Sequence, residues 1–322
     1  VEAGSTILQA AKKLGIFIPT FCTDDLERLP AKHCMNCSEY GDCKMCSCEV
    51  EGEVSLLTAC NTPAREGMVV WTESVEVNNA RVNILQRMLA MHPLDCMNCG
   101  KLGACKLQKY CEMYGVMEPV YTMPYEHREK DLSNRFYFQE MDKCIRCGKC
   151  VRVCRELVGV NALVMAQKGN MAYVMPNGGK DMSETACVSC GNCVSVCPVG
   201  ALMPKSQQFF RQWETQKVTT TCSYCGVGCQ IEYSVRNGKI VDAKPANGPS
   251  NQGLLCVKGK FAFDFINHKD RLKYPMVRKN GKLVRASWDE ALNTVAKKIT
   301  EVKAEYGPDA IAGFSSARTV NE

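Results

Sequence analysis

The order of apolar and polar positions predicts several short elements instead of a few long ones. Between residues 7 and 14 the apolar positions keep helical spacing, and Gly15 ends that helix. Short strands are predicted next, over residues 48–50, 54–57 and 68–71. This part of the chain therefore fits a small β-rich module.

The same periodicity predicts two further helices. One covers residues 79–91 and has a single apolar face. The other begins after Ser287, which forms a capping box with Glu290, carries an apolar stripe and ends at Gly307. Both are amphipathic, so each needs a neighbouring surface to cover its apolar side.

Strands are predicted from alternation and turn residues. Residues 231–235 and 239–241 alternate on either side of Asn237-Gly238, a strong signal for a β-hairpin. A further strand is expected over residues 311–314. The fold class is therefore expected to be α+β, divided among several small domains.

Composition narrows the class of protein. The chain has 322 residues and 23 cysteines, many of them in C-x2-C pairs, which in a long chain indicates metal binding and a reducing, cytoplasmic compartment. No apolar run approaches the roughly 20 residues of a membrane span. The formal net charge is +6, but the basic residues are scattered. Five bound clusters would bring the total to roughly −3, so nucleic-acid binding is not expected.

Two matched runs of cysteines carry the least ambiguous chemistry. The pattern C-x2-C-x2-C-x3-C occurs over residues 144–154 and again over residues 187–197. Such a loop supplies three thiolates to a cubane, and the fourth comes from the other run. Zinc sites or disulfides are the alternative, which two matched runs disfavour. Arg155 stands where proline often follows the last cysteine. The crossed assignment gives one [4Fe–4S] centre to Cys144, Cys147, Cys150 and Cys197, and another to Cys187, Cys190, Cys193 and Cys154.

The first cysteines of the chain include Cys22, Cys43-x2-Cys46 and Cys60, with short predicted strands around them. They resemble the plant-type [2Fe–2S] domain of complex I's large iron–sulfur subunit, a β-grasp fold. Two registers compete, since Cys22 with Cys34-x2-Cys37 fits the first half of the family pattern. The second half fits Cys43-x2-Cys46 followed after thirteen residues by Cys60, and residues 41–46 match the family's local motif. The resemblance implies a domain over residues 1–76 that lacks its first strand and has an insertion at about 26–40. Its implied ligands are Cys22, Cys43, Cys46 and Cys60.

The insertion has cysteines of its own. His33, Cys34 and Cys37 lie in it, and Cys48 follows nearby. These four side chains could form an extra zinc or iron–sulfur site. Free thiols in a surface loop are an equal alternative.

A histidine follows the helix predicted over residues 79–91. One imidazole and three thiolates can hold a [4Fe–4S] cubane, and the spacing H-x3-C-x2-C-x5-C matches the histidine-ligated cluster of the same complex I subunit family. The resemblance implies a helical domain over residues 77–116, with Cys111 outside the ligand set. The implied ligands are His92, Cys96, Cys99 and Cys105.

A fifth set comprises Cys222, Cys225, Cys229 and Cys256. It resembles the small [4Fe–4S] domain of molybdenum- or tungsten-bis(pterin guanine dinucleotide) oxidoreductases, formate dehydrogenases above all. The motif around Cys256 is close to that of formate dehydrogenases, in which the lysine at the position of Lys258 relays electrons between cluster and pterin. A plain surface lysine is the alternative.

These resemblances imply an ordered series of domains. After residues 1–76 and 77–116 come a connector (117–133), a two-cluster ferredoxin domain (134–212), the pterin-type [4Fe–4S] domain (213–275) and the beginning of a pterin-binding domain (276–322). The chain is therefore expected to be part of a longer polypeptide whose formate-binding residues lie beyond Glu322.

The implied function is electron transfer in the catalytic subunit of a cytoplasmic formate dehydrogenase acting on formate or CO2. The implied cofactors are one [2Fe–2S] cluster, four [4Fe–4S] clusters and the Mo or W pterin. The implied partner in a hetero-oligomer is a flavin subunit that exchanges electrons with NAD(P) and has its own clusters, or a ferredoxin or hydrogenase subunit.

Four alternatives stay open. Another enzyme with the same pterin would differ only in its substrate. A complex I-like conduit would lack counterparts of four cysteines and tends to have arginine in place of Lys258. An iron-only hydrogenase would carry its active-site cysteines after residue 210, where the Cys222 set stands instead. A structural zinc protein would bind no iron.

Overall fold

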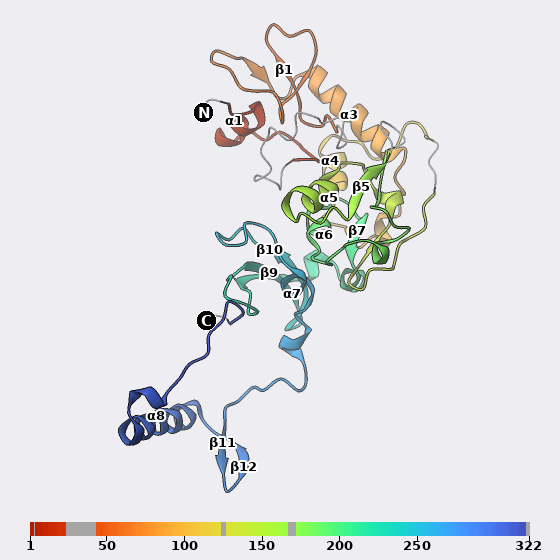
Figure 1. The fold of residues 1–322 in the computed structure, drawn as a ribbon. Helices are drawn as coiled ribbons and strands as arrows, with labels where there is room; N and C mark the ends of the chain where they lie inside the picture. The colour runs from red at the N-terminus through yellow and green to blue at the C-terminus, as the bar shows by residue number, and fades with distance from the viewer. Residues whose placement is uncertain (3, 24–42, 124–126, 167–171, 320–322) are drawn as a thin grey trace.

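The computed structural model describes residues 1–2, 4–23, 43–123, 127–166 and 172–319 of the chain. Within these ranges the fold mixes short helices with small antiparallel sheets. Figure 1 shows a compact body, with a hairpin and a long helix extending away from it near the C-terminus. Short 3₁₀ turns occur at Cys96–Asn98, Met141–Lys143, Met182–Glu184, Lys205–Phe209, Gln212–Glu214, Asp264–Asn267 and Pro308–Ala310, and a π-helical turn at Val153–Leu157.

The N-terminal module contains α1 (Ile7–Lys13) and a three-stranded antiparallel sheet in the order β2-β1-β3. The capping box of Thr6 and Gln9 begins α1, which confirms the predicted helix. The strand predicted over residues 54–57 is wrong for most of its length, because a turn follows β1 and Val54 is fully exposed. The strands are β1 (Ser47–Val50), β2 (Leu57–Thr58) and β3 (Val70–Trp71).

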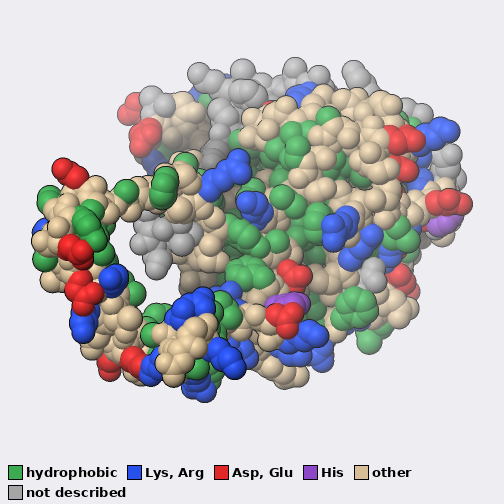
Figure 2. Space-filling view, turned by 60° about the horizontal axis from the view of Figure 1, so that its bottom comes forward, with side chains coloured by type: hydrophobic (Ala, Val, Ile, Leu, Met, Phe, Trp, Pro, Cys, Tyr) green, Lys and Arg blue, Asp and Glu red, His purple; other side chains and the backbone are tan. Residues whose placement is uncertain are grey.

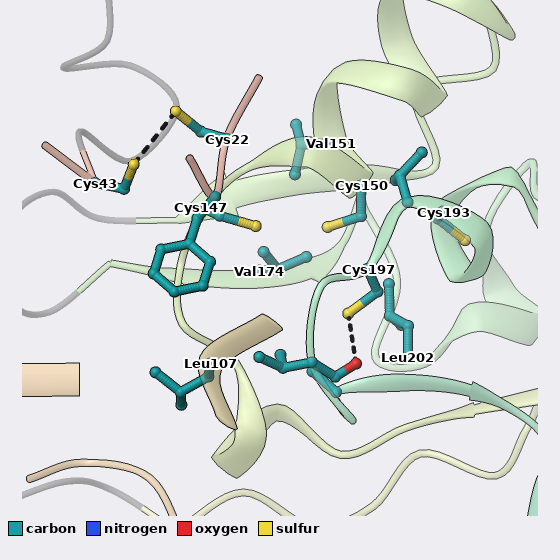
Figure 3. Packing of buried hydrophobic residues seen from close by; sticks show 14 of the residues in the cluster. Cys22, Cys43, Leu107, Cys147, Cys150, Val151, Val174, Cys193, Cys197 and Leu202 are labelled. Carbon is teal, nitrogen blue, oxygen red and sulfur yellow. Dashed lines mark hydrogen bonds between the residues drawn. The ribbon is translucent and has the colours of Figure 1, made fainter. Parts of the chain in front are cut away.

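Two helices connect this module to the rest of the body. α3 (Val75–Leu89) confirms the predicted helix but starts earlier, because Ser74 accepts a hydrogen bond from the backbone N–H of Val77. α4 (Lys106–Met113) packs on α3. Together they bury apolar side chains in the largest core of the described chain (Figure 3).

The unit that the sequence predicts to be a two-cluster ferredoxin domain follows. Its first strand, β4 (Tyr137–Gln139), pairs with its last, β7 (Leu202–Pro204), which closes the unit on itself. Between them β5 (Leu163–Ala166) pairs with β6 (Tyr173–Pro176). Two short helices, α5 (Lys149–Arg152) and α6 (Asn192–Val196), pack against each other.

The next unit is a three-stranded antiparallel sheet in the order β10-β9-β8 with α7 (Val257–Phe261) packed on it. Asn237 (φ 50°) and Gly238 (φ 72°) both have left-handed backbone, as a tight hairpin turn requires, and this confirms the predicted hairpin. Its strands are β8 (Gln216–Thr221), β9 (Gln230–Arg236) and β10 (Lys239–Pro245).

The C-terminal part stands apart from the body (Figure 1). It consists of the hairpin β11 (Met276–Lys279) and β12 (Lys282–Arg285), followed by α8 (Trp288–Tyr306). Ser287 caps α8, as predicted, by accepting from the backbone N–H of Glu290. The strand predicted over residues 311–314 is wrong, because that segment forms no strand and no strand of the described chain pairs with it.

The surface agrees with the scattered charge of the sequence. Lysine and arginine side chains form several separate groups on the face shown in Figure 2, with hydrophobic and acidic side chains between them. Among the described residues no helix is both long and apolar enough to cross a membrane.

Arg81 connects the N-terminal module to the helices. Its side chain is completely buried. One guanidinium nitrogen donates to the Tyr114 hydroxyl (2.9 Å) and the other to the backbone carbonyl of Ser47 on β1 (3.0 Å). Charge-assisted hydrogen bonds to buried acceptors are stronger than neutral ones, so this side chain holds β1, α3 and the segment after α4 together.

We expect Arg81→Met to lower the free energy of unfolding by about 2–3 kcal/mol, because it leaves the Ser47 carbonyl without its donor. Chemical denaturation of the anaerobic protein would measure this. Arg87→Met, an exposed position on the same helix, is the matched control and should change stability by about 0.5 kcal/mol or less. Equal effects of the two substitutions would contradict the assigned role of Arg81.

Candidate metal centres

The two matched cysteine runs have the same local backbone. Arg146 (φ 60°) and Ser189 (φ 53°), at equivalent places in the two runs, both have left-handed backbone. Two residues later Gly148 and Gly191 do so as well, and they begin α5 and α6. This repeated conformation wraps each C-x2-C-x2-C loop around a central space.

Each loop also directs an N–H group at sulfur. The backbone N–H of Arg146 donates to Cys144 Sγ and that of Ser189 donates to Cys187 Sγ, both at 3.3 Å. A third N–H, that of Ala162, donates to Cys154 Sγ at 3.2 Å. Hydrogen bonds of this kind stabilise negative charge on the sulfur of a bound cluster.

The fold brings the cysteines together in the crossed sets. One cavity, with an empty volume of about 340 Å³, is lined by Cys144, Cys147, Cys150 and Cys197. A second of about 340 Å³ is lined by Cys154, Cys187, Cys190 and Cys193. In both, the fourth cysteine of one run lies with the first three of the other. Figure 3 shows Cys147, Cys150 and Cys197 around the first space.

The thiols of the first set are costly to ionise without a nearby cation. Burial raises the pKa of Cys144 to about 11 and that of Cys147 to about 12. Burial also raises the pKa of Cys150 well above the usual range, and it does the same for Cys193 of the second set. Bound iron supplies the positive charge that makes thiolates stable in such surroundings, so the residues present fit an iron–sulfur cluster.

His92 and its three cysteines line one cleft together with Cys111. The Nδ1 atom of His92 is buried and has no hydrogen-bond partner among the described residues. Burial, and next the positive charge of Lys143, lower the pKa of His92 to about 4. The imidazole is therefore neutral near pH 7 and keeps a lone pair for a metal, as ligation requires.

The His92 set adjoins the first ferredoxin cavity. A Cβ atom at Gly200 would lie 2.5 Å from Cys99 Sγ, so only glycine allows this approach. The buried Lys143 ammonium lies 3.1 Å from Asp95 Oδ2 and 2.8 Å from Glu140 Oε1. Because Asp95 precedes Cys96 and Lys143 precedes Cys144, the ion pair joins two ligand loops.

The N-terminal cysteines are buried in two adjoining cores. Cys22 and Cys43 have their sulfur atoms 3.5 Å apart (Figure 3), and hydrogen bonding from Cys22 lowers the pKa of Cys43 to about 7. Cys46 and Cys60 lie in the small core beneath β1. The backbone N–H of Ala59, the residue before Cys60, donates to the Cys46 carbonyl, so the backbone around Cys60 lies next to that around Cys46.

The proposed extra site lies mostly outside the described residues, since His33, Cys34 and Cys37 fall within residues 24–42. Cys48 is described, and its thiol donates to the Leu57 carbonyl within the sheet (3.4 Å). Burial raises the pKa of Cys48 to about 11, so the thiol is neutral. The extra site remains a prediction.

The fifth set is held by the hairpin unit. The backbone N–H of Cys222 donates to the Cys229 carbonyl (2.8 Å), which closes the first loop. The backbone N–H of Gly226 donates to Ala317, far along the chain. Burial and the neighbouring Cys256 and Cys225 raise the pKa of Cys222, consistent with sulfur atoms that lie near one another.

α7 begins directly after Cys256 and carries two lysines of different character. Lys258 is exposed, with its ammonium 5.6 Å from the centre of the Tyr224 ring. Lys260 is buried and pairs with the equally buried Asp242 at 3.5 Å. Lys260 therefore fixes α7 on the sheet, which leaves Lys258 free to point away from it.

No group of three or more His, Cys, Asp or Glu side chains is gathered tightly enough, in the part of the chain that the structure describes, to hold a single metal ion. The ligand sets therefore rest on the residues that line each cavity and on the pattern of the sequence.

Five family models match successive parts of the chain. They are a 2Fe-2S iron-sulfur cluster binding domain (residues 1–75), the iron-sulfur binding region of NADH-ubiquinone oxidoreductase-G (81–119), the ferredoxin-like domain of NADH-quinone oxidoreductase subunit 3 (136–203), the molybdopterin oxidoreductase Fe4S4 domain (215–268) and molybdopterin oxidoreductase (271–322).

Curated relatives align with the whole length of the chain. The chain is 37% identical over 323 residues to NADPH-Fe(3+) oxidoreductase subunit alpha of Geobacter sulfurreducens, and 39% identical over 326 residues to the NADH-quinone oxidoreductase G 2 subunit of Rhizobium meliloti. It is 32% identical over 367 residues to the Bacillus subtilis protein named "Putative formate dehydrogenase YrhE". Each alignment covers 100% of this chain.

The chain matches the N-terminal iron–sulfur region of a formate dehydrogenase-like subunit. This confirms the resemblance inferred from the cysteine motifs. The chain spans 36% of the length of each of these relatives, so it corresponds to about a third of such a subunit. Among solved structures, an NAD+-reducing [NiFe]-hydrogenase in the H2-reduced state aligns with a TM-score of 0.56 at 27% identity, over 64% of this chain and 82% of that one.

Two residues that lie next to the predicted ligands, Asn192 and Tyr137, were not singled out from the sequence. Asn192 is buried; its side chain donates to the Leu255 carbonyl (3.0 Å) and accepts from the Leu255 N–H (3.1 Å). Tyr137 lines the second ferredoxin cavity. Asn192 and Leu255 each directly precede a predicted ligand, and that adjacency is the signal that could have singled them out.

Pairs of substitutions can test the crossed ligand sets. We expect Cys144→Ala with Cys197→Ala to remove one cubane, about four irons per chain, and Cys144→Ala with Cys154→Ala to remove two. Iron analysis and Mössbauer spectroscopy of anaerobic protein would measure the loss. Cys111→Ala should keep all the iron. The reverse order of the two double variants would mean that each run holds its own cluster.

The role of His92 as a ligand can be tested by replacing its neutral imidazole with an anionic thiolate. We expect His92→Cys to keep the iron content but to shift one [4Fe–4S] midpoint potential to a more negative value, because an anionic thiolate replaces a neutral imidazole. Redox titration followed by EPR would show this, with the exposed His268→Cys as control. Unchanged potentials for every cluster would exclude His92 as a ligand.

Proposed function

We propose that this chain is the electron-transfer region of the catalytic subunit of a formate dehydrogenase, which carries electrons between a Mo or W pterin site and a partner redox subunit. Its family relatives support the coarser function, electron transfer through iron–sulfur clusters in a molybdopterin oxidoreductase or NADH-quinone oxidoreductase G-like protein. The observation that carries the proposal is the unbroken series of cysteine sets that ends at Lys258 and the pterin-type domain.

Contacts between neighbouring sets support a continuous path. Asn192, next to Cys193, is hydrogen-bonded to Leu255, next to Cys256, which joins the fifth set to the ferredoxin unit. The two ferredoxin cavities adjoin, since α5, which carries Cys150, packs against α6, which carries Cys193. These contacts hold neighbouring cysteine sets next to one another, as electron transfer between the centres requires.

The path continues toward the N-terminal module. The side chain of Lys101 donates to the Cys197 carbonyl (2.9 Å), which holds the His92 set against the first ferredoxin cavity. On α4, the hydroxyl of Tyr110 donates to the Thr20 carbonyl (3.1 Å) and its ring meets Phe21 edge-on at 4.9 Å. Phe21 directly precedes Cys22, so this helix lies between the two outer sets.

At the other end, we assign Lys258 the relay between the fifth cluster and the pterin. When bound, the Mo or W pterin supplies the chemistry that converts formate to CO2, one proton and two electrons. The chain's own contribution is to hold Lys258 on α7, directly after the ligand Cys256, with its ammonium exposed beside Tyr224. The clusters then move the two electrons one at a time.

The proposed partner is a flavin subunit that exchanges electrons with NAD(P), or a hydrogenase or ferredoxin subunit, in a cytoplasmic hetero-oligomer. The names of the relatives support a multi-subunit redox complex, since they include subunits of NADPH and NADH oxidoreductases. The solved hydrogenase that aligns with the chain is also NAD+-reducing.

The names of the relatives also favour a second candidate function. An NAD(P)H-linked conduit without formate chemistry would use the same clusters and would fit the Geobacter and Rhizobium relatives equally well. The retained lysine at position 258 favours the pterin enzyme, because complex I-like subunits tend to have arginine there.

The deciding experiment is formate-dependent reduction of a viologen dye by the full-length protein purified without oxygen, with Mo and W quantified in the same sample. Dye reduction with either metal present is the expected result. A metal-loaded protein that ignores formate would keep the pterin enzyme and change its substrate. Iron without Mo or W would favour the NAD(P)H-linked conduit.

The relay can be tested separately. We expect Lys258→Met to leave the iron, Mo and W contents unchanged and to slow cluster reduction by formate at least tenfold, because the path from pterin to cluster loses its intermediate group. Rapid-mixing absorption spectroscopy would measure the rate. Lys273→Met, another exposed lysine of the same unit, is the control. Equal rates for parent and Lys258→Met would make Lys258 a surface lysine.

A further inference from the structure

Tyr137 places a hydroxyl group inside the second ferredoxin cavity. The residue begins β4, where it pairs with Pro204 of β7, and its side chain has no exposed surface. Its hydroxyl lies 3.4 Å from Cys187 Sγ. Tyr137 lines the cavity that Cys187 shares with its three partner cysteines. The strand pairing fixes the backbone, so the ring has little freedom to turn away.

The direction of this hydrogen bond follows from chemistry. A cysteine bound to iron is a thiolate, so it carries no proton and can only accept. An ordinary tyrosine phenol has a pKa of about 10, so it keeps its proton near pH 7 and can donate. The Tyr137 hydroxyl therefore donates to the sulfur once a cluster is bound.

Among the described residues that line it, the other ferredoxin cavity has no equivalent of this hydroxyl. Both loops have the matched backbone donor, from Arg146 to Cys144 and from Ser189 to Cys187. The described lining of the Cys144 cavity contains no side-chain hydroxyl. Tyr137 thus gives the Cys187 cavity a hydroxyl donor that the described lining of the Cys144 cavity, which contains the buried Lys149 instead, does not have.

We propose that Tyr137 raises the reduction potential of the centre held by Cys154, Cys187, Cys190 and Cys193 through an O–H···S hydrogen bond to Cys187. Reduction adds negative charge to a cluster, and a donor to a ligand sulfur stabilises that charge. Tyr137 is a positioning residue, because it acts through Cys187 and touches no substrate. The inference rests on the ligand sets of the proposed function.

The centre beside Tyr137 lies next to the fifth cysteine set, so a change in its potential would affect electron transfer between the two. The same loop carries Asn192, whose two hydrogen bonds to Leu255 reach the segment that ends at Cys256. The centre beside Tyr137 is therefore the first ferredoxin centre reached from the fifth set. A higher potential there favours the passage of electrons out of the fifth cluster and into the ferredoxin unit.

The test is Tyr137→Phe in the full-length protein, which removes one oxygen and keeps the ring. EPR-monitored redox titration should show one [4Fe–4S] midpoint shifted to a more negative value, with the other centres unchanged. The expected shift is up to a tenfold change in the oxidised-to-reduced ratio, about 59 mV for a one-electron couple. Iron analysis of the same sample tests the ligand sets independently of the shift.

Tyr110→Phe is the matched control. Tyr110 is also buried, but its hydroxyl donates to a backbone carbonyl and not to sulfur, so no ferredoxin midpoint should move. Unchanged midpoints in Tyr137→Phe with full iron content would overturn the proposal. An equal shift in both variants would overturn it as well, since the effect would not be specific to Cys187.

A second measurement covers the case in which Tyr137→Phe loses iron. Growth with 3-fluorotyrosine labels every tyrosine, including the 11 of this chain, and makes each phenol a stronger donor. The midpoint of the same centre should then rise in the parent protein. A labelled parent whose midpoints all equal those of the unlabelled protein would overturn the proposal.

Discussion

The structure depends on one electrostatic constraint, the cost of placing thiolates in an apolar interior. Of the eight cysteines of the two ferredoxin cavities four are buried and four are half-buried, and burial raises the pKa of Cys144 to about 11 and of Cys147 to about 12. Ionised, these sulfurs need iron nearby; neutral, they are ordinary apolar core. Cluster binding and core formation would therefore use the same side chains, since seven of the eight cysteines of the two cavities, all but Cys190, lie in or against the largest core of the described chain.

The protein also buries positive charges of its own near the cysteine sets, on lysine side chains. Lys143 is paired with Asp95 and Glu140 between two ligand loops, and Lys260 is paired with Asp242 beneath the fifth set. A buried ion pair adds little net stability, but removing one partner is costly. Such pairs therefore hold the loops in one arrangement, which matters where centres must keep a fixed separation.

Sequence patterns predicted those parts of the molecule that depend on local chemistry. The helix capped by Ser74, the Asn237-Gly238 hairpin and the capped α8 all follow from short-range signals, and the cysteine spacing indicated which cavities would form. The strands expected over residues 54–57 and 311–314 failed because a strand also needs a partner at the right place, which alternation alone does not reveal. Asn192 and Tyr137 were missed for a related reason, since their partners Leu255 and Cys187 lie 63 and 50 residues away.

The hydrogen bond from Gly226 to Ala317 has a consequence for biosynthesis. All eight cysteines of the ferredoxin unit lie between residues 144 and 197, so their backbone can fold soon after that segment leaves the ribosome. The loop from Cys222 to Cys229 acquires one of its backbone partners only after residue 317 has been made. Folding along the chain is therefore staggered: the backbone of the ferredoxin-like unit can form early in translation, whereas the loop from Cys222 to Cys229 is completed later, when the segment that follows α8 has returned to it.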